Sequence, residues 1–299
     1  MMPPMRILCA TDLLPGSEAA VERAGLLSDR FQADLTLLHI VAPVGSEPIL
    51  EQTLQTALTQ MTLRAQPPQW HAQRLPAVGI RSGSPPALIV DTLEESKHDL
   101  LVVGPPGKRP LRNVLEGTIV EKALAARTCP VLIVRHEPVG PYRRVLLAVD
   151  LSGASASVVR AVEVLILTPE TEALIVHAYE PPYMGMLRDA GVGTQSIASH
   201  AQEWTSDATR AVRHFVSSES RDLARYEVRI EQGPPAAAIL RLVEAYQPDL
   251  LVMGTRGGGR VHRALLGSVA IRVLSEIECD ALVVPAGTFD LADPTQAHR

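Results

Sequence analysis

The chain has 299 residues, of which 46% are hydrophobic, 20% are charged and only 3% are aromatic. At about 150 residues per domain, this length predicts two domains. The formal charge of −5 and the scarcity of aromatic rings for base stacking argue against a protein that binds nucleic acid or an anionic membrane.

Short apolar runs alternate with amphipathic helical patterns along the chain. The runs are too continuous for half-exposed strands, so they predict buried parallel strands at 6–10, 35–41, 77–81, 100–103 and 131–134, then at 144–149, 173–178, 227–231, 250–253 and 281–284. Helices are predicted between them at 17–32, 47–65, 85–97 and 118–127, then at 155–167, 195–219, 235–246 and 268–277. Strands that alternate with helices indicate an α/β fold whose parallel sheet is covered on both faces.

The second half of the chain repeats the first. Residues 99–104 read DLLVVG and residues 249–254 read DLLVMG, at an offset of 150. Earlier in each half the offset is 138, because Asp12 at the end of ILCATD matches Asp150 at the end of LLAVD. The difference of 12 predicts an insertion in the second half, within 180–200.

The repeat sets the expected domain organisation. We expect two tandem doubly wound domains with five-stranded sheets, at 1–138 and 142–288, and a polar tail at 289–299. The segment 135–144, with two prolines and a glycine, is the expected linker.

The cysteines and the chain start indicate the compartment. Cys9, Cys129 and Cys279 are too few and too scattered for a disulfide framework or a cysteine zinc site. The start lacks the long apolar region of a signal peptide, and no run is long enough to span a bilayer. We therefore expect a cytoplasmic protein. Cys129 and Cys279 are expected to be buried small hydrophobic residues, with a redox pair between them as the alternative.

A glycine-rich loop follows the fourth predicted strand of each half. It reads Gly-x2-Gly-x9-Gly followed by Ser or Thr, at the same spacing in both halves. Glycines let backbone N–H groups approach phosphate oxygens, and the closing Gly-Ser or Gly-Thr opens a helix whose N-terminus favours an anion. The loops therefore predict a phosphate site in each half. The alternative is that the glycines serve only the turn and close helix packing.

With these motifs the chain resembles a tandem universal stress protein over essentially all of both halves. The resemblance implies a five-stranded sheet of order 3-2-1-4-5 and, in many members, ATP binding through the glycine motif. A separate subgroup lacks the motif and does not bind nucleotide. Members commonly dimerise through strand 5, so the two fifth strands of this chain are expected to pair as a pseudo-two-fold dimer within one molecule. A homodimer of whole chains is also expected from the family.

The fold class places the expected site. In an open doubly wound sheet, ligands lie beyond the strand carboxyl ends, here between strands 1 and 4. Asp12 and Asp150 end strand 1 and could accept hydrogen bonds from ribose hydroxyls; the alternative is that they are helix N-caps or turn residues. By resemblance, the backbone of Ile40 and of Ala178 would contact the adenine. The phosphates would lie on Gly104, Gly107, Gly117, Thr118 and Ile119 in the first half, and on Gly254, Gly257, Gly267, Ser268 and Val269 in the second.

The second site is expected to bind nucleotide better. Pro105 and Pro106 have no N–H donors, whereas Thr255 and Arg256 keep theirs at the equivalent positions. The histidines before Ile40 and Ala178 have no neighbouring ligand at zinc-like spacing, so His39 and His177 are expected to be strand-end residues and no metal site is predicted.

Three functions from different classes follow from these residues. The preferred one is an ATP-binding regulator of a stress response, whose occupancy changes its affinity for an unidentified protein partner. The second is a slow ATP hydrolase, slow because no general base or acidic cluster stands near the glycine loops; bound Mg²⁺ would rely on phosphates and water. The third is an interaction protein without nucleotide.

Overall fold

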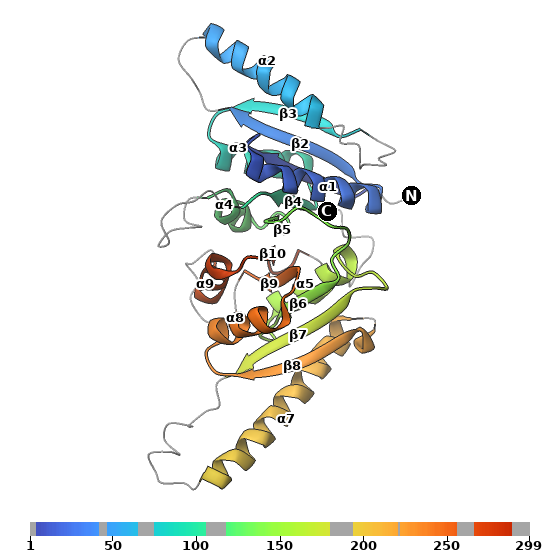
Figure 1. Cartoon of the computed structure of the whole chain (residues 1–299), viewed down its shortest axis with the longest axis vertical. Coiled ribbons are helices and arrows are strands. Elements are labelled where there is room, and N and C mark those ends of the chain that lie inside the picture. The colour runs from blue at the N-terminus through green and yellow to red at the C-terminus, as the bar shows by residue number, and fades with distance from the viewer. Residues whose placement is uncertain are drawn as a thin grey trace. The chain divides into compact units, whose positions relative to one another are not determined.

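The computed structural model describes residues 4–41, 47–64, 75–105, 118–179, 194–220, 222–255 and 266–288. All the strands and helices predicted from the sequence are present, with ends that shift by a few residues. The chain divides into two compact units, Met1–Pro141 with Glu278–Thr288, and a second that covers Tyr142–Ile277 (Figure 1).

The first unit is a parallel sheet with helices in its connections. In chain order it contains β1 (Arg6–Thr11), a 3₁₀ turn (Pro15–Ser17), α1 (Glu18–Phe31), β2 (Asp34–Val41), α2 (Glu47–Arg64), β3 (Ala77–Ser82), α3 (Pro85–Ser96), β4 (Leu100–Val103), α4 (Ile119–Ala126) and β5 (Val131–Ile133). The order β3-β2-β1-β4-β5 confirms the predicted 3-2-1-4-5 topology.

The second unit repeats this arrangement. It contains β6 (Arg144–Ala148), α5 (Gly153–Leu165), β7 (Glu172–Tyr179), α7 (Thr194–Glu219), a 3₁₀ turn (Leu223–Arg225), β8 (Tyr226–Gln232), α8 (Pro235–Tyr246), β9 (Leu250–Gly254) and α9 (Ser268–Glu276). Its strands lie in the order β8-β7-β6-β9 and are parallel. The α/β class is therefore confirmed in both halves.

The fifth strand of the second repeat, β10 (Asp280–Val284), belongs to the first compact unit. It pairs with β5 in the antiparallel sense, with Val283 opposite Val131 and Ala281 opposite Ile133. The predicted pairing of the two fifth strands is confirmed. Continuing this register places Cys279 opposite Arg135, roughly 20 Å along the strand from Cys129. A disulfide needs Cα atoms within about 7 Å, so the alternative of a redox pair is wrong.

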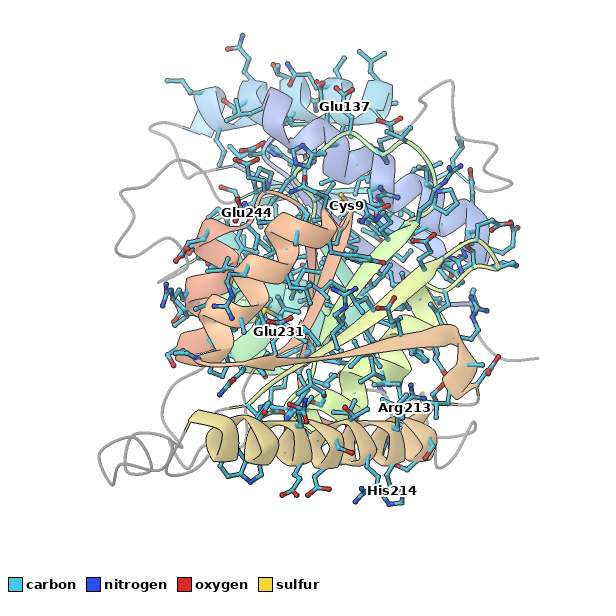
Figure 2. The ribbon with its side chains drawn as sticks, turned by 60° about the horizontal axis from the view of Figure 1, so that its bottom comes forward. Cys9, Glu137, Arg213, His214, Glu231 and Glu244 are labelled. Carbon is cyan, nitrogen blue, oxygen red and sulfur yellow. The ribbon has the colours of Figure 1, made fainter. Side chains whose placement is uncertain are left out.

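Burial explains why the strands read as unbroken apolar runs. Ile7, Leu8 and Cys9 of β1 have no exposed surface, as expected for a strand covered on both faces. Burial raises the pKa of the Cys9 thiol to about 12. The helices are instead amphipathic, as α7 illustrates: Val212 is fully buried, whereas Arg213 and His214 are exposed (Figure 2). Within the described residues, no helix is long and apolar enough to cross a membrane.

Two aspartates test how burial changes the contribution of a carboxylate to stability when it accepts hydrogen bonds from the backbone. Asp280 is 3% exposed and its Oδ1 accepts from the N–H groups of Arg135 (2.7 Å) and His136 (3.4 Å). Replacing it by alanine removes a buried, charged acceptor of two hydrogen bonds, and we expect a loss of about 1–3 kcal/mol in the free energy of unfolding.

Asp249 is the matched control, since it accepts from the N–H groups of Arg143 (2.7 Å) and Arg144 (2.6 Å) but is exposed. Water can replace its oxygens, so Asp249→Ala is expected to cost less than about 1 kcal/mol. Urea titration of both variants measures the difference. Equal losses would contradict the role assigned to burial.

His98, between α3 and β4, predicts a pH dependence of stability. It is 6% exposed, and its Nδ1 is buried with no hydrogen-bond partner among the residues that the structure describes. Burial lowers the pKa of His98; a hydrogen bond to the Thr92 backbone opposes this, and the charge of Arg6 adds to it. The unfolded chain therefore binds a proton at higher pH than the folded chain does. Stability from His98 is complete above the unfolded value near pH 6.5 and is lost as the pH falls through the lower folded pKa.

The test is the free energy of unfolding of wild type and His98→Asn at several pH values between 7.5 and 5.0. We expect the wild type to lose more stability than the variant as the pH falls, because only the wild type must protonate a buried imidazole. If the free energy of unfolding falls equally with pH in both proteins, a group other than His98 causes the pH dependence.

Candidate functional site

In each unit the second strand runs past the end of the first. β1 ends at Thr11, opposite His39, while β2 continues to Val41 beside β3. β6 ends at Ala148, opposite Val176, while β7 continues to Tyr179 beside β8. The extra residues lie at the carboxyl end of the sheet, beside the point between strands 1 and 4 where the winding reverses.

This stagger determines where the backbone of Ile40 and Ala178 faces. The carbonyl of Val41 accepts from Gly83 N–H, and the carbonyl of Tyr179 accepts from Gly233 N–H, both at 3.0 Å. Those carbonyls therefore face the loops that follow the third strands. Since backbone groups alternate sides along a strand, the N–H and C=O of the preceding residues face the first strand, beyond its end. This is the direction that the expected adenine contact requires.

A histidine ties the second strand to the end of the first in both units. His39 Nδ1 lies 2.8 Å from the carbonyl oxygen of Thr11, and His177 Nδ1 lies 2.9 Å from that of Val149. A carbonyl only accepts, so Nδ1 carries the proton. Both bonds end on the residue that precedes the predicted aspartate, so the histidines fix the backbone from which the aspartate projects.

The two aspartates are exposed but are held differently. Asp12 Oδ1 accepts one hydrogen bond, from Leu14 N–H at 3.0 Å. Asp150 Oδ1 accepts from Ser152 N–H (3.1 Å), Ser152 Oγ (2.5 Å) and Ser155 Oγ (2.7 Å). Neither is a helix N-cap, because those positions are Ser17 for α1 and Ser152 for α5. Both are turn residues with the carboxylate at the surface.

A leucine in the left-handed region follows each aspartate. Leu13 has φ 63° and Leu151 has φ 62°. This conformation costs a residue with a Cβ roughly 1–2 kcal/mol, so both units hold strain at the same place. The strained residue turns the chain sharply out of the sheet and leaves the aspartate at the carboxyl end of the strand.

The glycine loop of the second unit is closed at its base. Gly267 N–H donates to the carbonyl of Thr255 at 2.8 Å, and Thr255 and Leu266 are both buried. This bond brings the start of α9 next to Gly254, the last residue of β9. Gly267 is the N-cap of α9 and makes no side-chain capping bond, so Ser268 and Val269 open a helix whose first N–H groups have no cap acceptor from that residue.

The first unit caps the equivalent helix with a side chain. Thr118 is the N-cap of α4, and its Oγ1 accepts from Glu121 N–H at 3.2 Å, while Ile119 begins the helix. Three of the predicted phosphate-site glycines, Gly107, Gly117 and Gly257, lie outside the described residues, as do Pro106 and Arg256.

Gly104, at the end of β4, has a packing role of its own. A Cβ at this position would lie 3.1 Å from the carbonyl oxygen of Gly16 and 3.3 Å from Ser17 Cα. The loop between β1 and α1 therefore passes so close that a Cβ would require it to shift by a few tenths of an ångström. For this glycine, the packing explanation holds whether or not a ligand binds.

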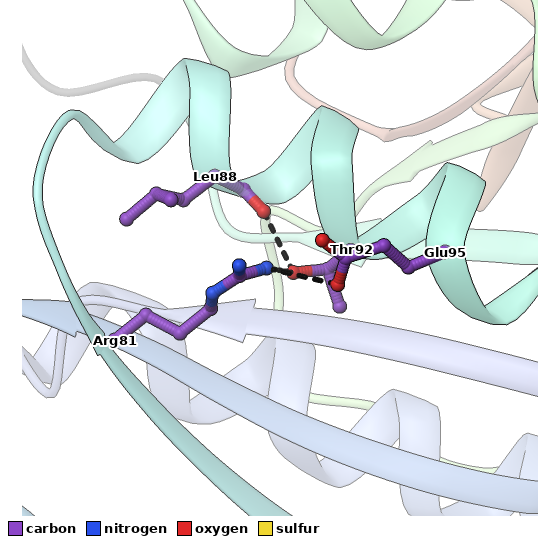
Figure 3. A network of polar contacts seen from close by, with 4 residues as sticks. All are labelled: Arg81, Leu88, Thr92 and Glu95. Carbon is purple, nitrogen blue, oxygen red and sulfur yellow. Dashed lines mark hydrogen bonds and ion pairs between the residues drawn. The ribbon is translucent and has the colours of Figure 1, made fainter.

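The charged residues opposite Ile40 and Ala178, the positions expected to contact the adenine, interact with side chains of neighbouring helices. Arg81 lies opposite Ile40 in the ladder, and its guanidinium donates to Thr92 Oγ1 (2.9 Å) and pairs with Glu95 (3.3 Å) on α3 (Figure 3). The equivalent residue opposite Ala178 is Glu231, which pairs with Arg241 of α8 at 3.8 Å. The charges are reversed between the units, but in both the side chain turns toward the helix.

The residues that surround the aspartates were not predicted from the sequence. Thr11, Ser17, Ser152 and Ser155 were not predicted as site residues, yet all of them hydrogen-bond within the turn after strand 1. The signal was the spacing of Asp150, Ser152 and Ser155 in DLSGAS, because serine hydroxyls commonly bond to a nearby aspartate or backbone group in turns.

Substituting Gly104 separates packing from ligand binding. Gly104→Ala forces the backbone of Gly16 and Ser17 to move, so we expect a loss of about 1–3 kcal/mol in the free energy of unfolding without any nucleotide. Gly153→Ala is the matched control, since a Cβ there meets nothing within 4 Å and alanine favours the start of α5. Thermal unfolding measures both; an unchanged Gly104→Ala midpoint would contradict the close approach.

Known proteins resemble the chain over both halves. The sequence model of the universal stress protein family matches residues 4–135 and again 141–285. A universal stress protein of Mycolicibacterium smegmatis is 25% identical over 309 aligned positions, which cover 93% of this chain and 96% of that protein. A universal stress protein of Thermus aquaticus is 30% identical over 145 residues, 48% of this chain and 98% of that protein.

A solved structure agrees with the fold. The universal stress protein from Archaeoglobus fulgidus superposes with a TM-score of 0.69 at 21% identity, covering 94% of this chain and 96% of that one. Because the family model matches twice and together covers nearly the whole length, the chain belongs to the universal stress protein family as a tandem member.

Proposed function

We propose that the chain is an ATP-binding regulator of a stress response, and that its better nucleotide site is in the second unit. The observation that carries the proposal is the meeting of three complementary features at one end of that unit's sheet. The exposed carboxylate of Asp150 follows the end of the first strand. The backbone of Ala178 faces the space beyond that end. The hydrogen bond from Gly267 N–H to the carbonyl of Thr255 holds the start of α9 beside them.

Each feature suits one part of an adenine nucleotide. The N–H and C=O of Ala178 match the donor and acceptor edge of the adenine ring, and Asp150 accepts from ribose hydroxyls. The N–H groups of Gly254, Gly257, Gly267, Ser268 and Val269 would hold the phosphates at a helix N-terminus. In the first unit, Asp12 and Ile40 would act in the same way with Gly104, Gly107, Gly117, Thr118 and Ile119.

Regulation is favoured over hydrolysis by the chemistry of these residues. His177 uses Nδ1 on a backbone carbonyl, and Asp150 Oδ1 accepts three hydrogen bonds from its own turn. Among the residues that the structure describes, no group of three or more histidine, cysteine or acidic side chains could hold a metal ion. Mg²⁺ that arrives with ATP would thus be bound by phosphate oxygens and water. The side chains of His177 and Asp150 are already hydrogen-bonded, so turnover that used either of them as a general base would be slow.

We also propose that the protein works in the cytoplasm and as a homodimer of tandem chains, with a further protein as its partner. The compartment is supported by the cysteines, since none of the three forms a disulfide and two are buried. The dimer is supported by family membership alone.

The first experiment is to denature the purified protein and quantify the released nucleotide per chain by chromatography. We expect at least one ATP per chain, and two if both sites are filled. Finding no nucleotide, even after incubation with ATP and Mg²⁺, would favour the interaction protein without a ligand. ADP as the only product would favour the slow hydrolase.

A charge at the start of α9 tests the site directly. Gly267→Glu places a carboxylate where the phosphates would lie, so we expect the affinity of the second unit for ATP to fall at least about 100-fold. Ile271→Glu is the matched control, because Ile271 is on the same helix with its side chain 46% exposed. Calorimetric titration compares the two; equal affinities in folded protein would contradict the site.

A further inference from the structure

We propose that the outward face of α2, in the first unit, is a surface through which two copies of this chain associate. The inference rests on the homodimer of tandem chains that the proposed function includes, and it identifies the surface that joins them. The face is formed by Ile49, Gln52, Thr56, Thr59 and Leu63, here called the α2 row. Its partner is the same row on a second copy.

Only one side of α2 is buried within its own unit. Ala57 and Met61 are 5% and 0% exposed, and the helix packs against β2 and β3 (Figure 1). On the opposite side Ile49 is 54% exposed and Leu63 is 72% exposed. The residues of the α2 row follow one another at alternating spacings of three and four, which places all of them on one face of the helix.

This exposed face is uncharged, unlike that of the equivalent helix in the second unit. The sequence from 52 to 63, QTLQTALTQMTL, contains no acidic or basic residue. In α7, the exposed residues include Glu203, Asp207, Arg210, Arg213 and His214. The fold therefore does not require an uncharged helix at this place. A charged residue near a two-fold axis would meet its own like charge, so an uncharged face suits pairing with a second copy.

The threonines of α2 need no hydrogen-bond acceptor from a partner. Thr53, Thr56, Thr59 and Thr62 each donate to the carbonyl of the residue four positions earlier, at 2.7 to 3.0 Å. A hydroxyl has one hydrogen, so each of these donors stays satisfied when the face is covered. Burying an unsatisfied polar group would cost free energy, and for these donors that cost does not arise.

The α2 row is symmetric about its midpoint. Thr56 lies seven residues from Ile49 and seven from Leu63. A second copy can therefore meet the row with Thr56 beside its own counterpart, and the apolar ends then meet apolar ends whether the helices run parallel or antiparallel. A contact between two identical surfaces has to be self-complementary in this way.

The edge of β5 is closed within the chain, so a second copy needs another surface. β5 pairs with β4 on one side and with β10 on the other. α2 has 18 residues, so its face is about 27 Å long and roughly 10 Å wide. A contact of that size is at the low end for specific complexes, below about 1,200 Å² in total. We therefore expect a weak dimer that depends on protein concentration.

Sedimentation velocity of the full chain measures the association, over roughly 1 to 200 µM protein because a contact of this size is weak. We expect the mass to rise from that of one chain towards that of two. In Ile49→Lys/Leu63→Lys, lysine meets lysine whichever way the helices run, and the apolar contact is lost. The dissociation constant should rise at least about 10-fold.

Leu58→Lys/Val139→Lys is the matched control, since it adds the same charge at two exposed apolar residues outside the row. Leu58 is 43% exposed and lies on another side of α2, at about 100° per residue, and Val139 is fully exposed in the linker. This variant should keep the dissociation constant within about 2-fold. Circular dichroism verifies that both variants are folded.

Thr56→Cys tests the symmetry of the row while keeping its apolar ends. The introduced thiols of two copies would lie side by side, so mild oxidation should link the chains into a covalent dimer that a reductant separates. Leu58→Cys, on another side of the helix, should link no more than the wild type does. The wild type accounts for Cys279, the natural cysteine that is partly exposed, because Cys9 and Cys129 are buried.

The outcomes separate this inference from the proposals on which it rests. A dimer that persists in Ile49→Lys/Leu63→Lys, with no linking of Thr56→Cys, would overturn the α2 row and leave the homodimer standing. A chain that stays monomeric at every concentration would overturn both and assign the row to a different partner. Equal weakening in the control would overturn the row by showing that added charge alone is responsible. Nucleotide binding is tested separately, by the ATP released from the same preparation.

Discussion

The end of the first strand is the constraint on which each unit depends. β1 is hydrogen-bonded on both sides, to β2 and to β4, and β6 is held in the same way by β7 and β9. The histidine bond and the left-handed leucine then determine where the chain leaves the sheet. A central strand that is paired on both edges cannot shift register without moving buried side chains to the other face. The polar groups beyond its end are therefore carried on a rigid frame.

The elements that were predictable from sequence are those that burial controls. β1 and β4 read as unbroken apolar runs because both faces of the sheet are buried there. The antiparallel partner of β5 was expected from the exposed edge that a fifth strand would otherwise present. In contrast, Gly104 lies close to Gly16, which is far away in the sequence, so this contact could not be read from the sequence. The glycine-rich loop motif had instead assigned Gly104 to phosphate binding.

The serine hydroxyls could not be assigned from sequence for a different reason. Ser17 and Ser155 occupy the same place in the repeat, but a hydroxyl has one hydrogen and several acceptors within reach, so its partner depends on distances of a few tenths of an ångström. In the first unit the hydrogen of Ser17 goes to the carbonyl of Leu14 and its oxygen accepts from Thr11, whereas Ser155 donates to Asp150. Repeats that share a fold can thus differ in a site, whereas the reversal of Arg81 and Glu231 leaves the fold intact because exposed ion pairs contribute little stability.

At the nucleotide site that we propose for the second unit, the charges would favour one orientation of a mononucleotide. A negative carboxylate at Asp150 would repel phosphate and attract hydroxyl donors, while the N–H groups at the start of α9, which its N-cap Gly267 does not cap with a side chain, would attract phosphate. Neighbouring strands lie about 4.8 Å apart, so β6 and β9 hold these opposite preferences within the length of one nucleotide. A ligand bound in reverse would place its phosphates beside the carboxylate. In this proposed site, repulsion would therefore contribute to the selection of the orientation together with attraction.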